Sequence, residues 1–136
     1  MPDIGSITDV TGIEVGHYTD ERAGTGCTVV LSRAGAVAGV DVRGSAPATR
    51  ETDLLSVSSL VDEIHGVLLT GGSVFGLDAA AGVERYLERE NVGIQFAGHN
   101  IPIVPGAALF DLGVCDSSVR PGLAEGFKCC EQASMK

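Results

Sequence analysis

The 136 residues are enough for one domain with a buried core. Hydrophobic residues make up 44% of the chain but aromatic residues only 4%, with no tryptophan, so the core has to be built from Val, Leu, Ile and Ala. The net charge is −9 and the nine basic residues are scattered, which argues against a nucleic acid or an anionic membrane surface as the partner.

The sequence carries no signal for membrane insertion or export. No apolar run reaches the roughly 18 residues of a membrane span, and residues 1–5 lack a basic segment followed by an apolar one. We therefore expect a cytoplasmic protein. Its cysteines, Cys27, Cys115, Cys129 and Cys130, lack the spacing of zinc ligands or of a disulfide framework and are expected to be buried free thiols.

The first half of the chain predicts an antiparallel sheet. Apolar, β-branched segments at residues 13–17, 27–31 and 36–42 are separated by short connections, which favours antiparallel pairing of consecutive strands. Residues 43–53 mix small and charged residues without a period and indicate a loop. Residues 54–64 fit either a short helix or an extended segment.

The second half predicts a buried strand at residues 67–70 followed by a helix at 74–89. Within this helix, small and apolar residues recur at helical spacing on one arc and charged residues fill the other. The expected buried arc consists of Gly76, Ala79, Ala80, Val83, Tyr86 and Leu87. The segments expected next are strands at 93–96 and 101–104, an apolar run at 107–112, and a last helix that begins at Pro121 and presents Leu123, Phe127 and Cys130 on one face.

The junction between the strand at 67–70 and the helix is the first candidate for a binding site. Gly71 and Gly72 permit a sharp turn, and Ser73 follows them. The first N–H groups of a helix are free to bind a ligand, and the helix dipole adds partial positive charge. The Ser73 hydroxyl is expected to cap the helix. A nucleophilic Ser73 is disfavoured because the motif G-x-S-x-G would need glycine in place of Phe75.

The remaining titratable residues predict structure rather than chemistry. The histidines are far apart and lack neighbours at ligand spacing, so neither a metal site nor a cofactor is expected. Two adjacent carboxylates before a histidine indicate a solvated segment, and the mixed charges of the 43–53 loop indicate ion pairs. These residues are His17, His65 and His99; Asp62 and Glu63; and Arg43, Arg50, Glu51 and Asp53.

Continuous apolar runs set the expected architecture. The segments at 36–40, 67–69, 101–104 and 107–109 are too apolar for strands with one wet face, so the sheet should be covered on both sides. Two amphipathic helices can cover one face, and the other then needs a second sheet or another polypeptide. We therefore predict an α+β fold of the αββα sandwich type.

Eight segments, in their order and spacing, carry a resemblance to a known family. They are residues 7–10 (ITDV), 13–17 (IEVGH), 26–31 (GCTVVL), 39–44 (GVDVRG), 49–55 (TRETDLL), 67–83, 102–105 (PIVP) and 109–112 (LFDL). Together they resemble the DmpA family, which comprises L-aminopeptidase/D-esterases, β-peptidyl aminopeptidases and nylon-oligomer hydrolases. The resemblance extends over nearly the whole chain, to the last helix.

The resemblance implies a self-processing hydrolase of the αββα type. Such a precursor cuts itself before a Ser or Thr, which then becomes the nucleophile. That residue lies beyond this sequence in relatives, so residues 1–136 are expected to be a single incomplete domain, the N-terminal portion of the larger subunit, without a catalytic residue of its own. The implied partners are the remaining C-terminal segment or smaller subunit of the precursor, a small peptide or amide substrate, and further copies in a homo-oligomer.

The resemblance also implies five substrate-binding residues. Gly71, Gly72 and Ser73 would contribute backbone beside the cleft, and Phe75 one of its walls. Phe110, just before Asp111, stands where relatives can have a tyrosine that assists catalysis. Since phenylalanine lacks the hydroxyl, Phe110 is expected to be a second wall.

The activity implied is the cleavage of amino-terminal residues from short peptides, or of related amides and esters, by acyl transfer to a Ser or Thr outside this chain. One alternative is an acyltransferase of the ornithine acetyltransferase type. Another is a catalytically inactive module that holds a small anion at residues 70–73. A third is an esterase with Ser73 as its nucleophile.

Overall fold

The computed structural model describes residues 5–114 and 116–136. Residues 1–4, from which no export signal is expected, and Cys115, expected as a buried thiol, lie outside the described residues. None of the helices within the described ranges is long and apolar enough to cross a membrane.

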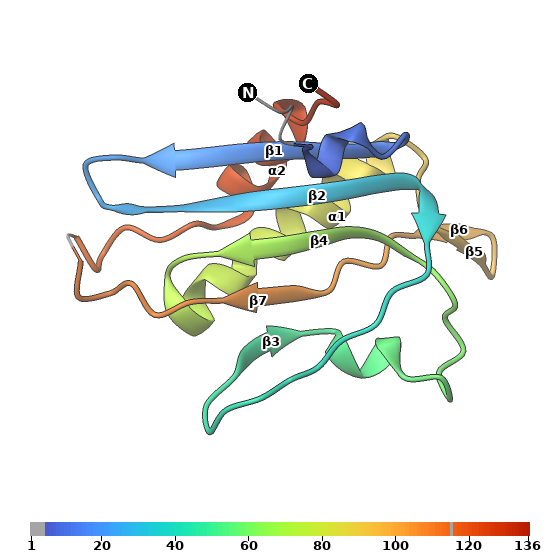
Figure 1. The fold of residues 1–136 in the computed structure, drawn as a ribbon, viewed down its shortest axis with the longest axis horizontal. Coiled ribbons are helices and arrows are strands. Elements are labelled where there is room, and N and C mark those ends of the chain that lie inside the picture. Colours follow the sequence, from blue (N-terminus) through green and yellow to red (C-terminus); the bar gives the residue numbers. More distant parts are fainter. Residues whose placement is uncertain (1–4, 115) are drawn as a thin grey trace.

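A five-stranded sheet with the order β1-β2-β4-β7-β3 forms the centre of the described structure (Figure 1). Its strands are β1 (Ile13–Asp20), β2 (Thr25–Ala36), β4 (Ile64–Thr70), β7 (Gly106–Ala108) and β3 (Ala48–Arg50). Neighbouring strands are antiparallel except β4 and β7, which are parallel. A separate hairpin of β5 (Ile94–Phe96) and β6 (His99–Ile101) confirms the strand predicted at 93–96.

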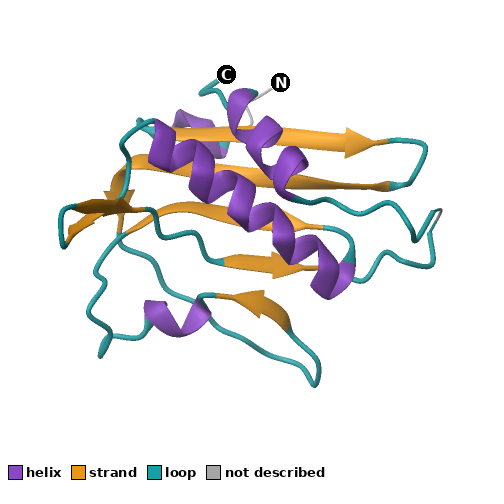
Figure 2. Cartoon of the chain, turned by 180° about the vertical axis from the view of Figure 1, so that it is seen from behind, coloured by secondary structure: helices purple, strands orange, loops and turns teal. Residues whose placement is uncertain are grey.

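Both α-helices lie on the same face of this sheet (Figure 2). They are α1 (Ala79–Arg89) and α2 (Leu123–Glu131), and short 3-10 helices occupy Ile7–Asp9, Thr52–Leu55 and Ser73–Asp78. The helix predicted at 74–89 is therefore a 3-10 turn that continues as α1. All residues expected on its buried arc are buried: Gly76, Ala79, Ala80, Val83, Tyr86 and Leu87.

The two helices approach each other through glycines. A side-chain carbon at Gly82 would collide with the backbone of Leu123, and one at Gly126 would collide with the backbone of Ala79. This close crossing places α2 against the sheet, where Cys129 and Cys130 join the core. The prediction of buried free thiols is confirmed for Cys27, Cys129 and Cys130. Of the face predicted for the last helix, Cys130 is buried, Phe127 is partly buried, and Leu123 is 37% exposed.

The two faces of the sheet differ in exposure, as the pleat of a strand requires. On β2, Cys27, Val29 and Leu31 are buried. On β4, Leu68 is fully buried whereas the next residue, Leu69, is 51% exposed. The described residues thus form one layer of helices and one main sheet in a mixed α/β structure, and a second main sheet is not among them.

The strand predicted at 36–42 is wrong. Strand β2 ends at Ala36, and the chain from 37 to 47 is irregular, with Val37 86% exposed. The cause lies just before this segment: Gly35 has a φ of 84°, and the register between β2 and β4 shifts after Leu31. Beyond this irregularity β2 pairs with β4 only at Ala36, opposite Ile64, and the ladder does not continue into residues 37–42.

Three other expectations about elements change. The loop predicted at 43–53 contains the short strand β3, and the undecided segment 54–64 begins within the 3-10 helix at Thr52–Leu55 and is then irregular. The strand predicted at 101–104 ends at Ile101, because Pro102 and Pro105 have no N–H to donate to a ladder. Single backbone bonds still link this stretch to β4, from His65 N–H to the Ile103 carbonyl and from Leu68 N–H to the Pro105 carbonyl.

Candidate functional site

The turn after β4 is built from a backbone that needs glycine. Gly72 has a φ of 81°, in the left-handed region that favours glycine. Gly71 is required for a different reason, since a side-chain carbon there would collide with the carboxylate of Asp111 and the hydroxyl of Thr25. The predicted tight turn at Gly71 and Gly72 is therefore confirmed.

The N–H groups of this turn are not free, contrary to the prediction. Gly71 N–H donates to the carbonyl of Gly26 at 2.8 Å, and Ser73 N–H donates to the carbonyl of Leu109 at 3.0 Å. Gly72 N–H donates to Oδ1 of Asp111 at 2.7 Å. Because each donor already has a partner and one partner is a carboxylate, these three groups are poorly suited to hold an anion.

Ser73 does not cap the helix either. Gly72 occupies the N-cap position, and no side chain caps this end. Ser73 itself has a φ of 55°, a left-handed conformation that is uncommon for a residue with a side chain. An N-cap residue typically has an extended backbone. Ser73 instead has a left-handed backbone and is the first residue of the 3-10 helix, so the capping prediction is wrong.

Asp111 is the residue that holds the turn in place. Its Oδ2 accepts a hydrogen bond from Thr25 Oγ1 at 2.6 Å, while its Oδ1 accepts from Gly72 N–H. Burial disfavours the ionised form, but the hydrogen bonds from Thr25 and Gly72 outweigh it and leave the pKa of Asp111 below its ordinary value. The carboxylate is therefore ionised at neutral pH and ties together the start of β2, the turn and the segment after β7.

The two predicted aromatic walls lie in different surroundings. Phe75 is 48% exposed, and the guanidinium of Arg120 lies over its ring at 3.9 Å from the ring centroid, a cation–π contact. Phe110 is 75% exposed, and the N–H of its neighbour Leu109 donates to the carbonyl of Thr70. The structure thus brings Gly71, Gly72 and Ser73 together with residues 109–111.

Two adjoining hollows lie on the sheet next to this turn. They share Leu69, Ala107 and Ala108 in their walls. The first, of about 390 Å³, is roofed by residues 38–43 and is mostly apolar. The second, of about 620 Å³, reaches Gly71. Neither hollow is lined by Phe75 or Phe110.

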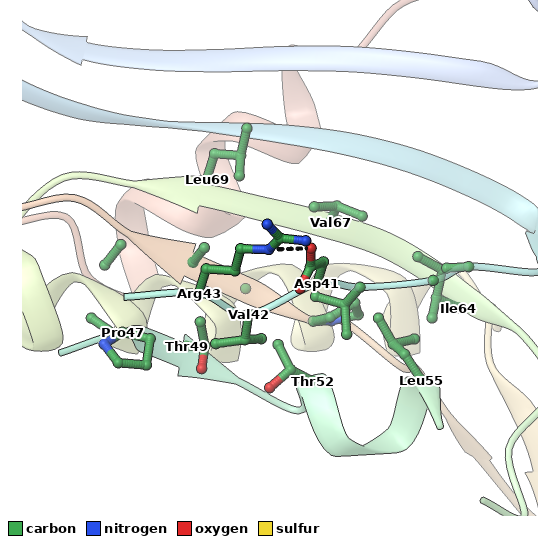
Figure 3. A pocket seen from close by; sticks show the side chains of 18 residues that line it. Asp41, Val42, Arg43, Pro47, Thr49, Thr52, Leu55, Ile64, Val67 and Leu69 are labelled. Carbon is green, nitrogen blue, oxygen red and sulfur yellow. Dashed lines mark hydrogen bonds and ion pairs between the residues drawn. The ribbon is translucent and has the colours of Figure 1, made fainter. Parts of the chain in front are cut away.

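The first hollow is shown from close by in Figure 3. Val67 and Leu69 of β4 lie on one side and Leu55 on the other, with the ion pair of Arg43 and Asp41 between them (Nε to Oδ2, 2.6 Å). A volume of this size falls within the range of small-ligand sites. Its apolar walls suit a hydrocarbon side chain better than a charged group.

The ion-pair network predicted among Arg43, Arg50, Glu51 and Asp53 is wrong, because both arginines pair with carboxylates outside this set. Arg43 pairs with Asp41, and Arg50 pairs with Glu84 of α1 at 2.8 Å. Glu51 instead accepts a hydrogen bond from Val104 N–H at 3.2 Å. The contacts of Arg50 and Glu51 hold the segment around β3 to its neighbours, whereas the pair of Arg43 and Asp41 lies within its own segment.

The histidines are dispersed, as expected. His65 is buried, its Nδ1 accepts a hydrogen bond from Ile103 N–H at 3.3 Å, and burial lowers its pKa. His17 Nδ1 lies 2.8 Å from Thr28 Oγ1, and His99 is on the exposed hairpin. In the residues that the structure describes, no group of three or more His, Cys, Asp or Glu is placed to hold a metal ion.

Besides the acceptors of the turn's N–H groups, sequence reasoning missed the contact between Thr25 and Asp111. The two residues are 86 positions apart, and Thr25 lies in a turn-rich segment without a distinctive motif. The only signal was the family resemblance around Asp111, which gave no partner.

A family model described as Peptidase family S58 matches residues 5–132. An uncharacterized aminopeptidase of Mycobacterium leprae is 47% identical over 138 residues, covering 96% of this chain and 38% of that protein. A 6-aminohexanoate-oligomer endohydrolase of Kocuria sp. is 34% identical over 126 residues, covering 92% of this chain and 33% of that protein. The chain therefore spans well under half the length of these relatives.

Among solved structures, a Burkholderia sp. beta-aminopeptidase has a similar fold. The TM-score is 0.61 at 23% sequence identity, and the similarity covers 95% of this chain and 38% of that one. At this level of identity the comparison concerns the fold alone.

Proposed function

This chain belongs to peptidase family S58, and from that membership we propose that it is the N-terminal part of the larger subunit of a self-processing aminopeptidase. The proposed reaction removes the amino-terminal residue from short peptides, or cleaves related amides and esters. The relatives named aminopeptidase and 6-aminohexanoate-oligomer endohydrolase support hydrolysis of an amide bond as the shared chemistry. The single observation that carries the proposal is the match of the family model to residues 5–132.

The proposed mechanism is acyl transfer to a Ser or Thr that a further part of the polypeptide supplies. Its hydroxyl attacks the substrate carbonyl, the amine leaves, and water then releases the acyl group. The residues of this chain would shape the cleft. Because the N–H groups of Gly71, Gly72 and Ser73 already have acceptors, we assign this turn the role of a rigid wall and expect the oxyanion donors to lie elsewhere.

The proposed architecture is an αββα sandwich in which a second sheet covers the face opposite α1 and α2. Two features support it: Leu69 is half exposed on that face, and an apolar hollow lies beside it. Leaving such a face in water is unfavourable for a monomer. The proposed cover is the remaining segment or smaller subunit of the same precursor. A homo-oligomer and a cytoplasmic location are also proposed, the latter supported by the free buried cysteines.

The decisive experiment is to express the whole polypeptide and to measure the intact mass and N-terminal sequence of every copurifying species. We expect a second polypeptide that begins with Ser or Thr, and release of p-nitroaniline from aminoacyl p-nitroanilides. Replacing that new N-terminal residue by alanine should abolish processing and activity together. A single unprocessed species that does not hydrolyse these substrates would contradict the proposal.

The alternatives are separated by simple measurements. An acyltransferase of the ornithine acetyltransferase type would give an acylated amine rather than the free acid when an amine acceptor is added. An esterase with Ser73 as its nucleophile would lose activity on Ser73→Ala, whereas we expect that variant to keep it. An anion-binding module at residues 70–73 would give binding heat with phosphate or a carboxylate. The carboxylate of Asp111 at this turn argues against that.

A further inference from the structure

Two cysteine sulfurs meet in the core between the sheet and the last helix. Cys27 lies on β2 and Cys129 on α2, 102 positions apart, with their Sγ atoms 3.3 Å from each other. The Cys129 thiol also lies 3.1 Å from the backbone carbonyl of Cys27, to which it donates. Both residues are almost fully buried, at 4% and 0% exposed.

The surrounding backbone holds the two sulfurs in this arrangement. Gly16 of β1 leaves room for the carbonyl of Cys129, since a side-chain carbon at this glycine would collide with it. Helix α2 is therefore held close to the strands. A disulfide bond is about 2.05 Å long, so the two sulfurs need to approach by roughly 1.3 Å for the bond to form. Cys130, the next residue of α2, is equally buried and serves as an internal reference.

We propose that Cys27 and Cys129 are a disulfide-forming pair that a small peroxide oxidises, locking α2 onto β2. One thiol, as its thiolate, attacks a peroxide oxygen and becomes a sulfenic acid, with hydroxide as the leaving group. The second thiol then attacks the sulfenic sulfur and releases water. Overall, two thiols and one hydrogen peroxide give one disulfide and two waters.

The environment of the pair sets its expected reactivity. The hydrogen bond with Cys129 and burial both raise the pKa of the Cys27 thiol above its ordinary value. The hydrogen bond with Cys27 lowers the pKa of the Cys129 thiol, although burial opposes this, so Cys129 is the thiol that supplies the thiolate. The rate of disulfide formation should increase as the pH is raised.

The disulfide would close a loop of about one hundred residues and restrict the unfolded chain. The chain-entropy description gives such a long loop a large stabilisation. We expect the melting temperature to increase by about 5 °C or more on oxidation, and to return to its initial value on reduction.

The test uses the whole polypeptide, purified in the reduced state and treated with hydrogen peroxide. Remaining thiols are alkylated in denaturant, and the protein is digested without reduction and mapped by mass spectrometry. We expect one cross-linked pair of peptides containing Cys27 and Cys129, lighter by two hydrogens than the two free peptides. The matched control Cys130→Ser should form the same link, and Cys27→Ser should form none and show no increase in melting temperature with peroxide.

The peptide map decides the question even where Cys27→Ser does not fold, because the wild type and Cys130→Ser identify the bond directly. The proposal is wrong where Cys27 and Cys129 are both recovered alkylated from peroxide-treated, folded protein. It is equally wrong where either one is found linked to Cys115 or Cys130, or where each is oxidised separately to a sulfinic acid. None of these outcomes bears on the proposed hydrolase activity, which is measured independently.

Discussion

The hydroxyl of Thr25 lies 2.6 Å from Oδ2 of Asp111 and joins the start of β2 to the segment after β7. The other carboxylate oxygen accepts from Gly72 N–H at 2.7 Å. One side chain therefore connects three segments that are distant in sequence, at the point where the second hollow reaches the turn. The geometry of the turn should depend on this carboxylate.

Asp111→Asn tests that dependence. The amide can accept only on its oxygen, so it cannot replace both hydrogen bonds with a charged acceptor. Hydrogen bonds to a charged group contribute about 1.5–3 kcal/mol, and we expect a loss in this range in urea unfolding. Asp41→Asn is the matched control: its partner Arg43 is 85% exposed, and loss of an exposed pair should cost less than about 1 kcal/mol. Equal losses in the two variants would show that Asp111 has no special role.

Gly71→Ala should be destabilising because the added carbon collides with the carboxylate of Asp111 and the hydroxyl of Thr25. Overpacking of this kind costs about 1–3 kcal/mol. Gly39→Ala is the control, since nothing lies within 4 Å of a side-chain carbon at Gly39. Thermal unfolding of both variants measures the difference. An unchanged melting temperature for Gly71→Ala would indicate that the turn and Asp111 are not in contact.

Because His65 is buried, we expect the folded protein to become less stable as the pH falls. Burial lowers its pKa in the folded state, so the unfolded chain binds a proton first as the pH falls below about 6.5. Protonation would also remove the lone pair with which Nδ1 accepts from Ile103 N–H. We expect the free energy of unfolding to decrease as the pH falls through this range, and His65→Gln to flatten that dependence. His99→Gln, on the exposed hairpin, should leave the slope as in the wild type.

Leu69→Asp tests the proposed second sheet. Leu69 is half exposed on the face without helices, so a charge there should affect the sheet itself little. A charge buried beneath a docked sheet is far more costly. In the whole polypeptide we therefore expect a lower yield of processed, soluble protein. Val57→Asp is the control, because Val57 is fully exposed on an irregular segment. Wild-type yield and processing in Leu69→Asp would contradict a covering layer at this position.

The hydropathy pattern correctly predicted those helices and strands that bury one continuous face. The helical arc from Gly76 to Leu87 and the strand before Gly71 are as expected, because each buries one continuous face. The segment 36–42 failed for the opposite reason. Its apolar run looks like a strand, but the backbone turns at Gly35 and the register shifts, neither of which a hydropathy pattern contains.

Of the candidate site, the sequence predicted the turn itself but not the distant residues that contact it. A double glycine after a buried strand indicates a turn, and the turn is present. Whether its N–H groups are free depends on Gly26 of β2 and on Leu109 and Asp111 of the segment after β7. Such long-range partners follow from the sheet order, and the parallel pairing of β4 with β7 was not evident from strand spacing.

The glycine-to-backbone crossing of α1 and α2 has a consequence for biosynthesis. The last helix supplies Cys129 and Cys130 to the interior, and nothing earlier in the described chain occupies their place. While the ribosome is still adding residues before 123, the nascent sheet presents an uncovered, water-exposed patch beside α1. Ribosome-bound fragments truncated before α2 should therefore recruit chaperones, and release from them should coincide with emergence of that helix.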